Sequence, residues 1–202
     1  GSVSLPGYAE AVAASDGLAV VLSVQRALEP PTYGFTVIDA ADPMRPRAAG
    51  GGALAGFLPQ RAALEGDLLV IAGHADPAAD GPATRLVAFD LADPDHPRPV
   101  GTTDWHADPA TGGRDVLALA VQGGVAHILT SPRNGGPGRE IRLVDLSGAE
   151  PVLLGALDVP SSGRRRERAE IVVAADGVLV ADGDGGLLVL RAPRPAPAGG
   201  RL

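Results

Sequence analysis

The chain has 202 residues and a formal net charge of −7, with 45% hydrophobic residues but only 3% aromatic ones. This length suits one domain with a sizeable core, and the acidic balance argues against the broad basic surface of a nucleic-acid-binding protein. The absence of cysteine excludes disulfides, thiolate catalysis and Cys-ligated zinc. No window approaches the ~18 consecutive apolar residues of a membrane-spanning helix.

One short pattern recurs four times: an apolar stretch that leads into a Pro-rich corner. Its copies run over residues 35–43, 86–94, 141–146 and 187–193. An Asp ends the apolar stretch in the first three copies (Asp39, Asp90 and Asp145), and the fourth copy has Arg191 there. A period of about fifty residues with strand-like content is typical of a β-propeller or a solenoid.

Each unit holds three short apolar segments bounded by turn residues, and such segments predict strands. In chain order they are 9–14, 18–23 and 35–40; 61–64, 68–73 and 85–91; 116–121, 125–130 and 141–146; and 169–174, 178–182 and 187–192. A fourth strand is expected after the corner of three units, at 47–54, 99–105 and 152–159. Turns such as Asp16-Gly17 join the first two segments and predict hairpins.

These segments predict an all-β protein, a β-propeller with four blades of about four antiparallel strands. The blades are expected at about 7–54, 55–105, 106–159 and 160–192 of a single domain over 1–202, with a Pro/Gly tail at 193–202. The fourth unit has no last strand of its own, so we expect residues 2–6, the N-terminal strand, to complete the last blade and remove exposed sheet edges. The alternative is a fragment of a longer propeller that pairs with another chain.

Three stretches of the chain resemble the LVIVD-type repeats of bacterial and archaeal β-propeller proteins: Leu5-Pro-Gly-Tyr8-Ala9, Val37-Ile-Asp-Ala-Ala-Asp-Pro43 and Ala181-Asp-Gly-Asp-Gly-Gly-Leu187. The resemblance covers nearly the whole chain and implies the propeller fold. It also implies a scaffold class found on secreted, periplasmic or cell-surface proteins, without a particular activity. The third corner, which lacks Asp-Pro, and Arg191 depart from the family pattern.

A ligand is expected on the face that carries the long connections between strands, because long loops on a rigid scaffold often carry function. These connections include 24–34, 74–84, 106–115, 131–140 and 160–167. The binding candidates there are aromatic and basic residues: Tyr33, Trp105, His106, Arg114, Arg164, Arg165, Arg166 and Arg168. Guanidinium groups offer a bidentate fork to carboxylate, phosphate or sulfate. The alternatives are a solvated Arg run and a Trp105 that fills the gap between blades.

The candidates for acid–base catalysis are Glu10, Glu170, His74 and His106. Alignment of the units on their hairpins places Glu10, Gln60 and Glu170 at one position near the start of the first strand, with Leu117 as the fourth member. Carboxylates that converge at a channel mouth can bind a cation or share a proton, and hydrogen bonds to loop amides are the alternative. For His74 and His106, no His-x-His or His-Glu-x-x-His spacing supports a metal site.

Asp182 and Asp184 are the remaining metal candidates, because Asp182-Gly-Asp184-Gly-Gly begins like a calcium-binding loop. The later acidic ligands of such a loop are missing, and a Gly-rich hairpin turn is the alternative explanation. His96 in a Pro-rich corner and His127 within a strand are expected to be structural.

The sequence therefore favours a non-catalytic binding or scaffold module that recognises a protein or a small anionic or polar ligand on its long-loop face. The alternative is an enzyme of lyase, hydrolase or isomerase type with an acid–base or metal site at the channel mouth. We expect no cofactor, no nucleic-acid partner and no membrane span.

Overall fold

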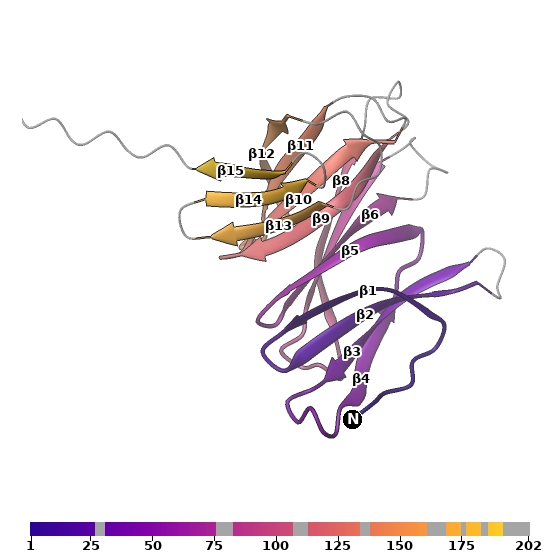
Figure 1. Ribbon diagram of the computed structural model, residues 1–202. Helices are drawn as coiled ribbons and strands as arrows, with labels where there is room; N and C mark the ends of the chain where they lie inside the picture. The colour runs from indigo at the N-terminus through magenta and orange to yellow at the C-terminus, as the bar shows by residue number, and fades with distance from the viewer. Residues whose placement is uncertain are drawn as a thin grey trace, which may run out of the picture.

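A computed structural model gives the structure of the protein, and it describes residues 1–26, 31–75, 83–106, 113–133, 138–160, 169–174, 177–182 and 186–191. Of His106, Asp182 and Arg191 only the backbone is described. The described residues form fifteen strands in four antiparallel sheets, arranged one after another along an arc (Figure 1). No helix in these ranges is long and apolar enough to cross a membrane.

The strands follow the chain order within every sheet. The first sheet contains β1 (Tyr8–Ser15), β2 (Leu18–Gln25), β3 (Thr32–Asp39) and β4 (Arg47–Ala53). The second contains β5 (Phe57–Glu65), β6 (Leu68–Ala75), β7 (Ala83–Asp90) and β8 (Arg98–His106). The third contains β9 (Arg114–Gln122), β10 (Val125–Pro132), β11 (Arg139–Asp145) and β12 (Val152–Val159), and the fourth β13 (Ala169–Ala174), β14 (Gly177–Asp182) and β15 (Leu187–Arg191).

The repeated Asp at the end of the third strand has a structural role in three units. Its Oδ1 accepts a hydrogen bond from the backbone N–H two residues later, at 3.1 Å for Asp39, 2.9 Å for Asp90 and 2.9 Å for Asp145. This local bond turns the chain out of the strand into the Pro-rich corner. The fourth unit has Arg191 at this position.

The first strand of three sheets contains a β-bulge at the same place. Glu10, Gln60 and Leu117 are the extra residues that have no cross-strand partner in the register of β1 with β2, β5 with β6 and β9 with β10. Glu170, the equivalent residue of β13, pairs regularly with Ala181. A bulge bends its strand and redirects the side chain at that point.

Three apolar clusters fill the spaces between consecutive sheets. The cluster between the first and second sheets includes Leu22, Phe35, Leu69 and Ile71, and the other two clusters lie between the second and third and between the third and fourth sheets. Aliphatic side chains dominate all three, as the low aromatic content leads one to expect. Burial of each Leu or Ile contributes about 1.5–3 kcal/mol, so these clusters hold the sheets together.

The prediction of an all-β, four-bladed β-propeller is confirmed, but the last blade differs from expectation. Among the described residues, the fourth sheet has three strands, and residues 1–7 form no strand. The amino nitrogen of Gly1 instead lies 3.3 Å from the carbonyl oxygen of Pro43, in the corner of the first sheet. Figure 1 shows the reason: β15 and the N-terminus stand at opposite ends of the arc, so β15 does not reach this segment.

Candidate functional site

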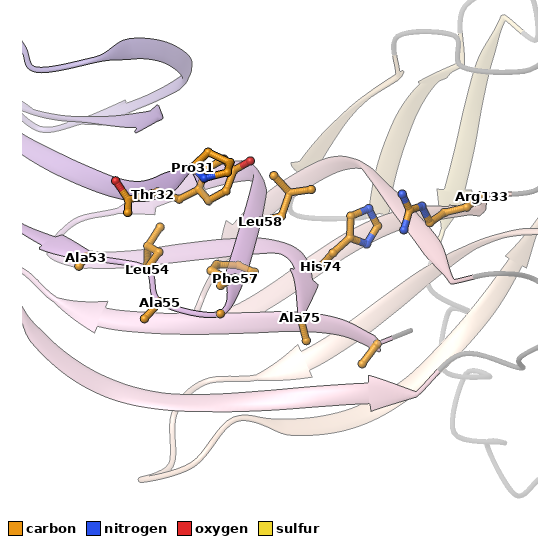
Figure 2. A pocket seen from close by; sticks show the side chains of 13 residues that line it. Pro31, Thr32, Ala53, Leu54, Ala55, Phe57, Leu58, His74, Ala75 and Arg133 are labelled. Carbon is orange, nitrogen blue, oxygen red and sulfur yellow. The ribbon is translucent and has the colours of Figure 1, made fainter. Parts of the chain in front are cut away.

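A pocket of about 500 Å³ opens between the first and second sheets, on the face where the long connections were expected (Figure 2). Its walls come from the start of β3, from the connection between β4 and β5, and from the facing ends of β6 and β7. The lining residues are Pro31, Thr32, Tyr33, Ala53, Leu54, Ala55, Gly56, Phe57, Leu58, His74, Ala75, Ala83 and Arg133. Most of this wall is apolar, and the ionisable side chains His74 and Arg133 lie together at one end.

The connection between β4 and β5 forms the apolar wall because Leu54, its first residue, and Phe57, the residue that follows it, are anchored in the core. Leu54 and Phe57 are buried in the cluster between the first two sheets. Gly56 between them has a φ of 62°, a conformation that favours glycine. Leu58, the next residue, is partly exposed and lines the pocket.

The polar end of the pocket is built by three strands from two sheets. His74, near the end of β6, places Nε2 3.0 Å from Oδ1 of Asp115 at the start of β9. Arg133, directly after β10, places Nε 3.6 Å from the same carboxylate oxygen. The backbone N–H of Arg133 donates to the carbonyl oxygen of Gly113 at 3.0 Å, which holds the end of β10 against the chain entering β9.

Gln60 connects the bulge of β5 to this cluster. Its side-chain amide donates to Oδ1 of Asp115 at 3.3 Å, and its Oε1 accepts the backbone N–H of Val116 at 2.7 Å. Asp115 therefore receives contacts from His74, Gln60 and Arg133, and polar contacts next to the two ionisable lining residues join the second and third sheets.

The environment of His74 favours its neutral form. Burial lowers the pKa of His74 from its ordinary value of 6.5, and the nearby positive charge of Arg133 lowers it further. The hydrogen bond and the negative charge of Asp115 act in the opposite direction but are smaller. A neutral imidazole with its proton on Nε2 donates to Asp115 and leaves Nδ1 as an acceptor.

The structure places the other catalytic candidates apart from this pair. Glu10 is exposed and accepts a hydrogen bond of 2.7 Å from Arg26. Glu170 is exposed on β13, and the first and fourth sheets stand at the two ends of the arc (Figure 1). The two carboxylates are therefore not neighbours in this structure. The side chain of His106, at the end of β8, lies outside the described residues.

Two of the binding candidates occupy interior positions. Trp105 is 7% exposed and belongs to the cluster between the second and third sheets, which agrees with the alternative that it fills the gap between blades. Arg114 donates to Oγ1 of Thr130 at 2.8 Å and to the carbonyl oxygen of Gly138 at 2.5 Å, and burial lowers its pKa. Both residues connect neighbouring parts of the protein.

Of the remaining candidates, Tyr33 lines the pocket. The basic run of Arg164, Arg165, Arg166 and Arg168 lies outside the described residues, as do Asp184 and the side chain of Asp182. Within the part of the chain that is described, no group of three or more His, Asp or Glu side chains is arranged to hold a metal ion. His96 lies in an exposed corner beside Asp93, and His127 is buried in β10.

Sequence reasoning missed Asp115 and Arg133, although both lie in expected long-loop regions. One signal was available: an Arg follows the second strand of two units, as Arg26 after β2 and Arg133 after β10. In the first unit this Arg stands over the ring of Tyr8, with 5.7 Å between the guanidinium carbon and the ring centre. In the third unit the same Arg reaches Asp115 instead.

No protein-family model matches the sequence, and the search of curated proteins found no match. Solved structures do resemble it. A computationally designed protein, Ika4, has a TM-score of 0.53 at 13% identity, with 94% of both chains covered. The β-propeller domain of the Trilobed protease from Pyrococcus furiosus, which has an open velcro topology, has a TM-score of 0.55 at 9% identity. That match covers 87% of this chain and 48% of the other. These likenesses support the β-propeller fold alone.

Proposed function

We propose that the protein is a binding module that holds a small ligand, largely apolar with one anionic or polar end, in the pocket between the first two sheets. One observation carries this proposal: a cavity of about 500 Å³ has an apolar wall with His74 and Arg133 gathered at one end. Pockets of roughly 300–1,000 Å³ with a few convergent polar groups are typical of small-molecule sites.

The two ends of the pocket suggest how the ligand lies. Its apolar part would contact Tyr33 and Leu58, which line the cavity without being fully buried in the core. Its polar end would accept hydrogen bonds from Arg133, whose side chain is about half exposed beside Asp115. A guanidinium group has five donors in a fixed fork, so it can serve the carboxylate and a ligand together.

The proposal extends to the setting in which the module works. The resemblance to LVIVD-type repeats supports a recognition role for a secreted, periplasmic or cell-surface protein. Two kinds of ligand combine the apolar part and the anionic end that the pocket would bind. One is a small amphiphilic molecule, and the other is an apolar peptide side chain beside a carboxylate.

The test is a titration with 8-anilino-1-naphthalenesulfonate, which combines an apolar ring system with an anionic group and fluoresces when bound. Charge-assisted hydrogen bonds contribute about 1.5–3 kcal/mol, so Arg133→Gln should weaken the pocket-bound component about tenfold or more. Leu58→Ser should weaken the same component by removing part of the apolar wall.

Matched variants separate the pocket from other apolar surface. Leu154→Ser removes an exposed Leu from β12, away from the pocket, and Arg45→Gln removes an exposed Arg from the Pro-rich corner. Both should bind the probe like the parent. Equal binding by the parent, Leu58→Ser and Arg133→Gln would overturn the proposed site.

A second function, acid–base catalysis in the same pocket, is favoured by the His74–Asp115 pair. A neutral imidazole held by a carboxylate is the form that accepts a proton from a substrate or water, and His74 of this pair lines the cavity. A screen of naphthyl esters distinguishes the two functions. Turnover that His74→Gln abolishes would favour the enzyme, and binding without turnover would favour the module.

A further inference from the structure

Every contact between consecutive sheets uses the same two faces. We call the face that packs on the next sheet the forward face and the one that packs on the preceding sheet the rear face. In the first sheet the forward face carries Val20, Leu22, Phe35 and Val37. It meets the rear face of the second sheet, where Leu69 and Ile71 are fully buried. The forward faces of the second and third sheets meet the rear faces of the third and fourth in the same way.

Among the described residues, this pattern leaves two apolar faces uncovered by another sheet, one at each end of the arc. The rear face of the first sheet carries Val12, which is 67% exposed, in a row with Val21, which is 8% exposed, and the half-buried Thr36. The forward face of the fourth sheet carries Val172, which is 56% exposed, in a row with Leu179 and Val189. Leu187 on the same face is 66% exposed. Contiguous exposed apolar residues of this kind mark interaction surfaces.

One uncovered face is a forward face and the other is a rear face, which is the combination that packs together between consecutive sheets. Val12 occupies in β1 the place that Ala62 holds in β5, and Val21 occupies in β2 the place of Ile71 in β6. Ala62 and Ile71 both pack in the cluster between the first two sheets. A forward face brought against Val12 and Val21 would therefore repeat a contact that the protein already makes three times.

Residues 1–7 follow the path of an outer strand from a sheet that would precede the first one. The amino nitrogen of Gly1 lies 3.3 Å from the carbonyl oxygen of Pro43. The backbone N–H of Gly50 in β4 makes the equivalent contact one unit later, where it donates to the carbonyl oxygen of Pro94 at 2.8 Å. Pro43 and Pro94 occupy the same place in successive corners. Six residues after each glycine, Gly7 and Gly56 turn the chain with φ of 78° and 62° into the next first strand.

Among the described residues, the fourth sheet contains only three strands, and β15 forms its outer edge. An edge strand can pair with an added strand through its free backbone groups. Within one chain, β15 and residues 1–7 stand at opposite ends of the arc (Figure 1). A second copy can supply both missing parts without changing any of the three existing contacts between sheets.

We propose that two copies of this chain join head to tail in a closed ring. The fourth sheet of each copy takes the first sheet of the other copy on its forward face, with residues 1–7 of that copy as a fourth strand beside β15. The two contacts are equivalent by two-fold symmetry, and closure uses both uncovered faces of both copies, whereas an unclosed series would continue as a fibre.

The first test is the mass of the protein in solution by light scattering after size exclusion. The parent should have twice the chain mass of 20.3 kDa. Val12→Glu and Val172→Glu should each reduce it to one chain, because each buries a charge in the proposed contact. Leu154→Glu, on an exposed residue of β12 outside both faces, should keep the double mass. A parent with the mass of one chain, or of more than two, would overturn the proposal.

A cross-linking test identifies the contact itself and does not depend on destabilising variants. The chain has no cysteine, so Val12→Cys and Val172→Cys chains, co-expressed with different tags, carry one thiol each. A short bismaleimide should join the two tagged chains, and neither variant should form a linked pair alone. If the double variant Val12→Cys/Val172→Cys forms only a link within one chain and the co-expressed chains form none, each chain closes on itself and the proposal is wrong.

Discussion

Asp115 organises the candidate site at the scale of single residues. One oxygen of its carboxylate is approached by His74 Nε2 at 3.0 Å, by the Gln60 amide at 3.3 Å and by Arg133 Nε at 3.6 Å. These partners lie 41, 55 and 18 positions away in the chain, so no local motif connects them. Their meeting depends on how the second and third sheets pack, which explains why sequence reasoning named His74 without its partner.

The buried histidines predict a pH dependence of stability. Burial lowers the pKa values of both His74 and His127 in the folded protein from the ordinary 6.5. The unfolded chain then binds more protons than the folded one at pH values below about 6.5, so the free energy of unfolding decreases as the pH falls through that range. Urea unfolding at about pH 5 and about pH 7.5 should show lower stability at the acid end.

Two variants test whether His127 causes part of this pH dependence of stability. His127 lies between its cross-strand neighbours Ala120 and Leu143, at the contact of the third and fourth sheets. His127→Leu should reduce the difference between the two pH values, because it removes one of the two buried imidazoles. Leu154→Ser, which removes no titratable group and lies on an exposed position of β12, should leave the difference unchanged. An identical slope in the parent and in His127→Leu would contradict this assignment.

At the scale of elements, every strand expected from the sequence is present except the N-terminal strand at residues 2–6, and most extend beyond the expected ends. The segment expected at 61–64 is β5 (Phe57–Glu65) in the structure, and the added first part of the strand contains Pro59, a residue that is rare inside sheets. Pro59 is tolerated beside the bulge at Gln60, where the regular pairing of β5 with β6 is interrupted. Apolar alternation and turn residues therefore predict the strands, but not the bulges that shape their ends.

The bulge at Gln60 should contribute to stability by joining two sheets. Gln60→Leu removes the acceptor of the Val116 N–H and a donor to Asp115. A buried backbone donor that is left without a hydrogen-bond partner lowers the free energy of unfolding by about 1–3 kcal/mol. Urea unfolding of Gln60→Leu should show a loss of that size. Gln25→Leu, an equivalent change at an exposed position of β2, should cost little. Equal losses in the two variants would contradict a specific role for the bulge.

At the scale of the whole molecule, the period of about fifty residues predicts four similar sheets and their order, and the structure has both. The expected closure by residues 2–6 within one chain is not present (Figure 1). A sequence repeat determines which faces meet, but the angle between successive sheets depends on how their side chains fit. The pocket has the same origin, since its walls come from the first two sheets together at the long-loop face.

Binding of an amphiphilic ligand in this pocket can be observed in a crystal structure of the protein soaked with 2-naphthalenesulfonate. We expect density for the ring system between Tyr33 and Leu58, with the sulfonate within hydrogen-bond distance of Arg133. The same soak of Arg133→Gln should show weaker or no density there. Naphthalenesulfonate bound only elsewhere in the parent, with this cavity filled by water, would show that the pocket is not the ligand site.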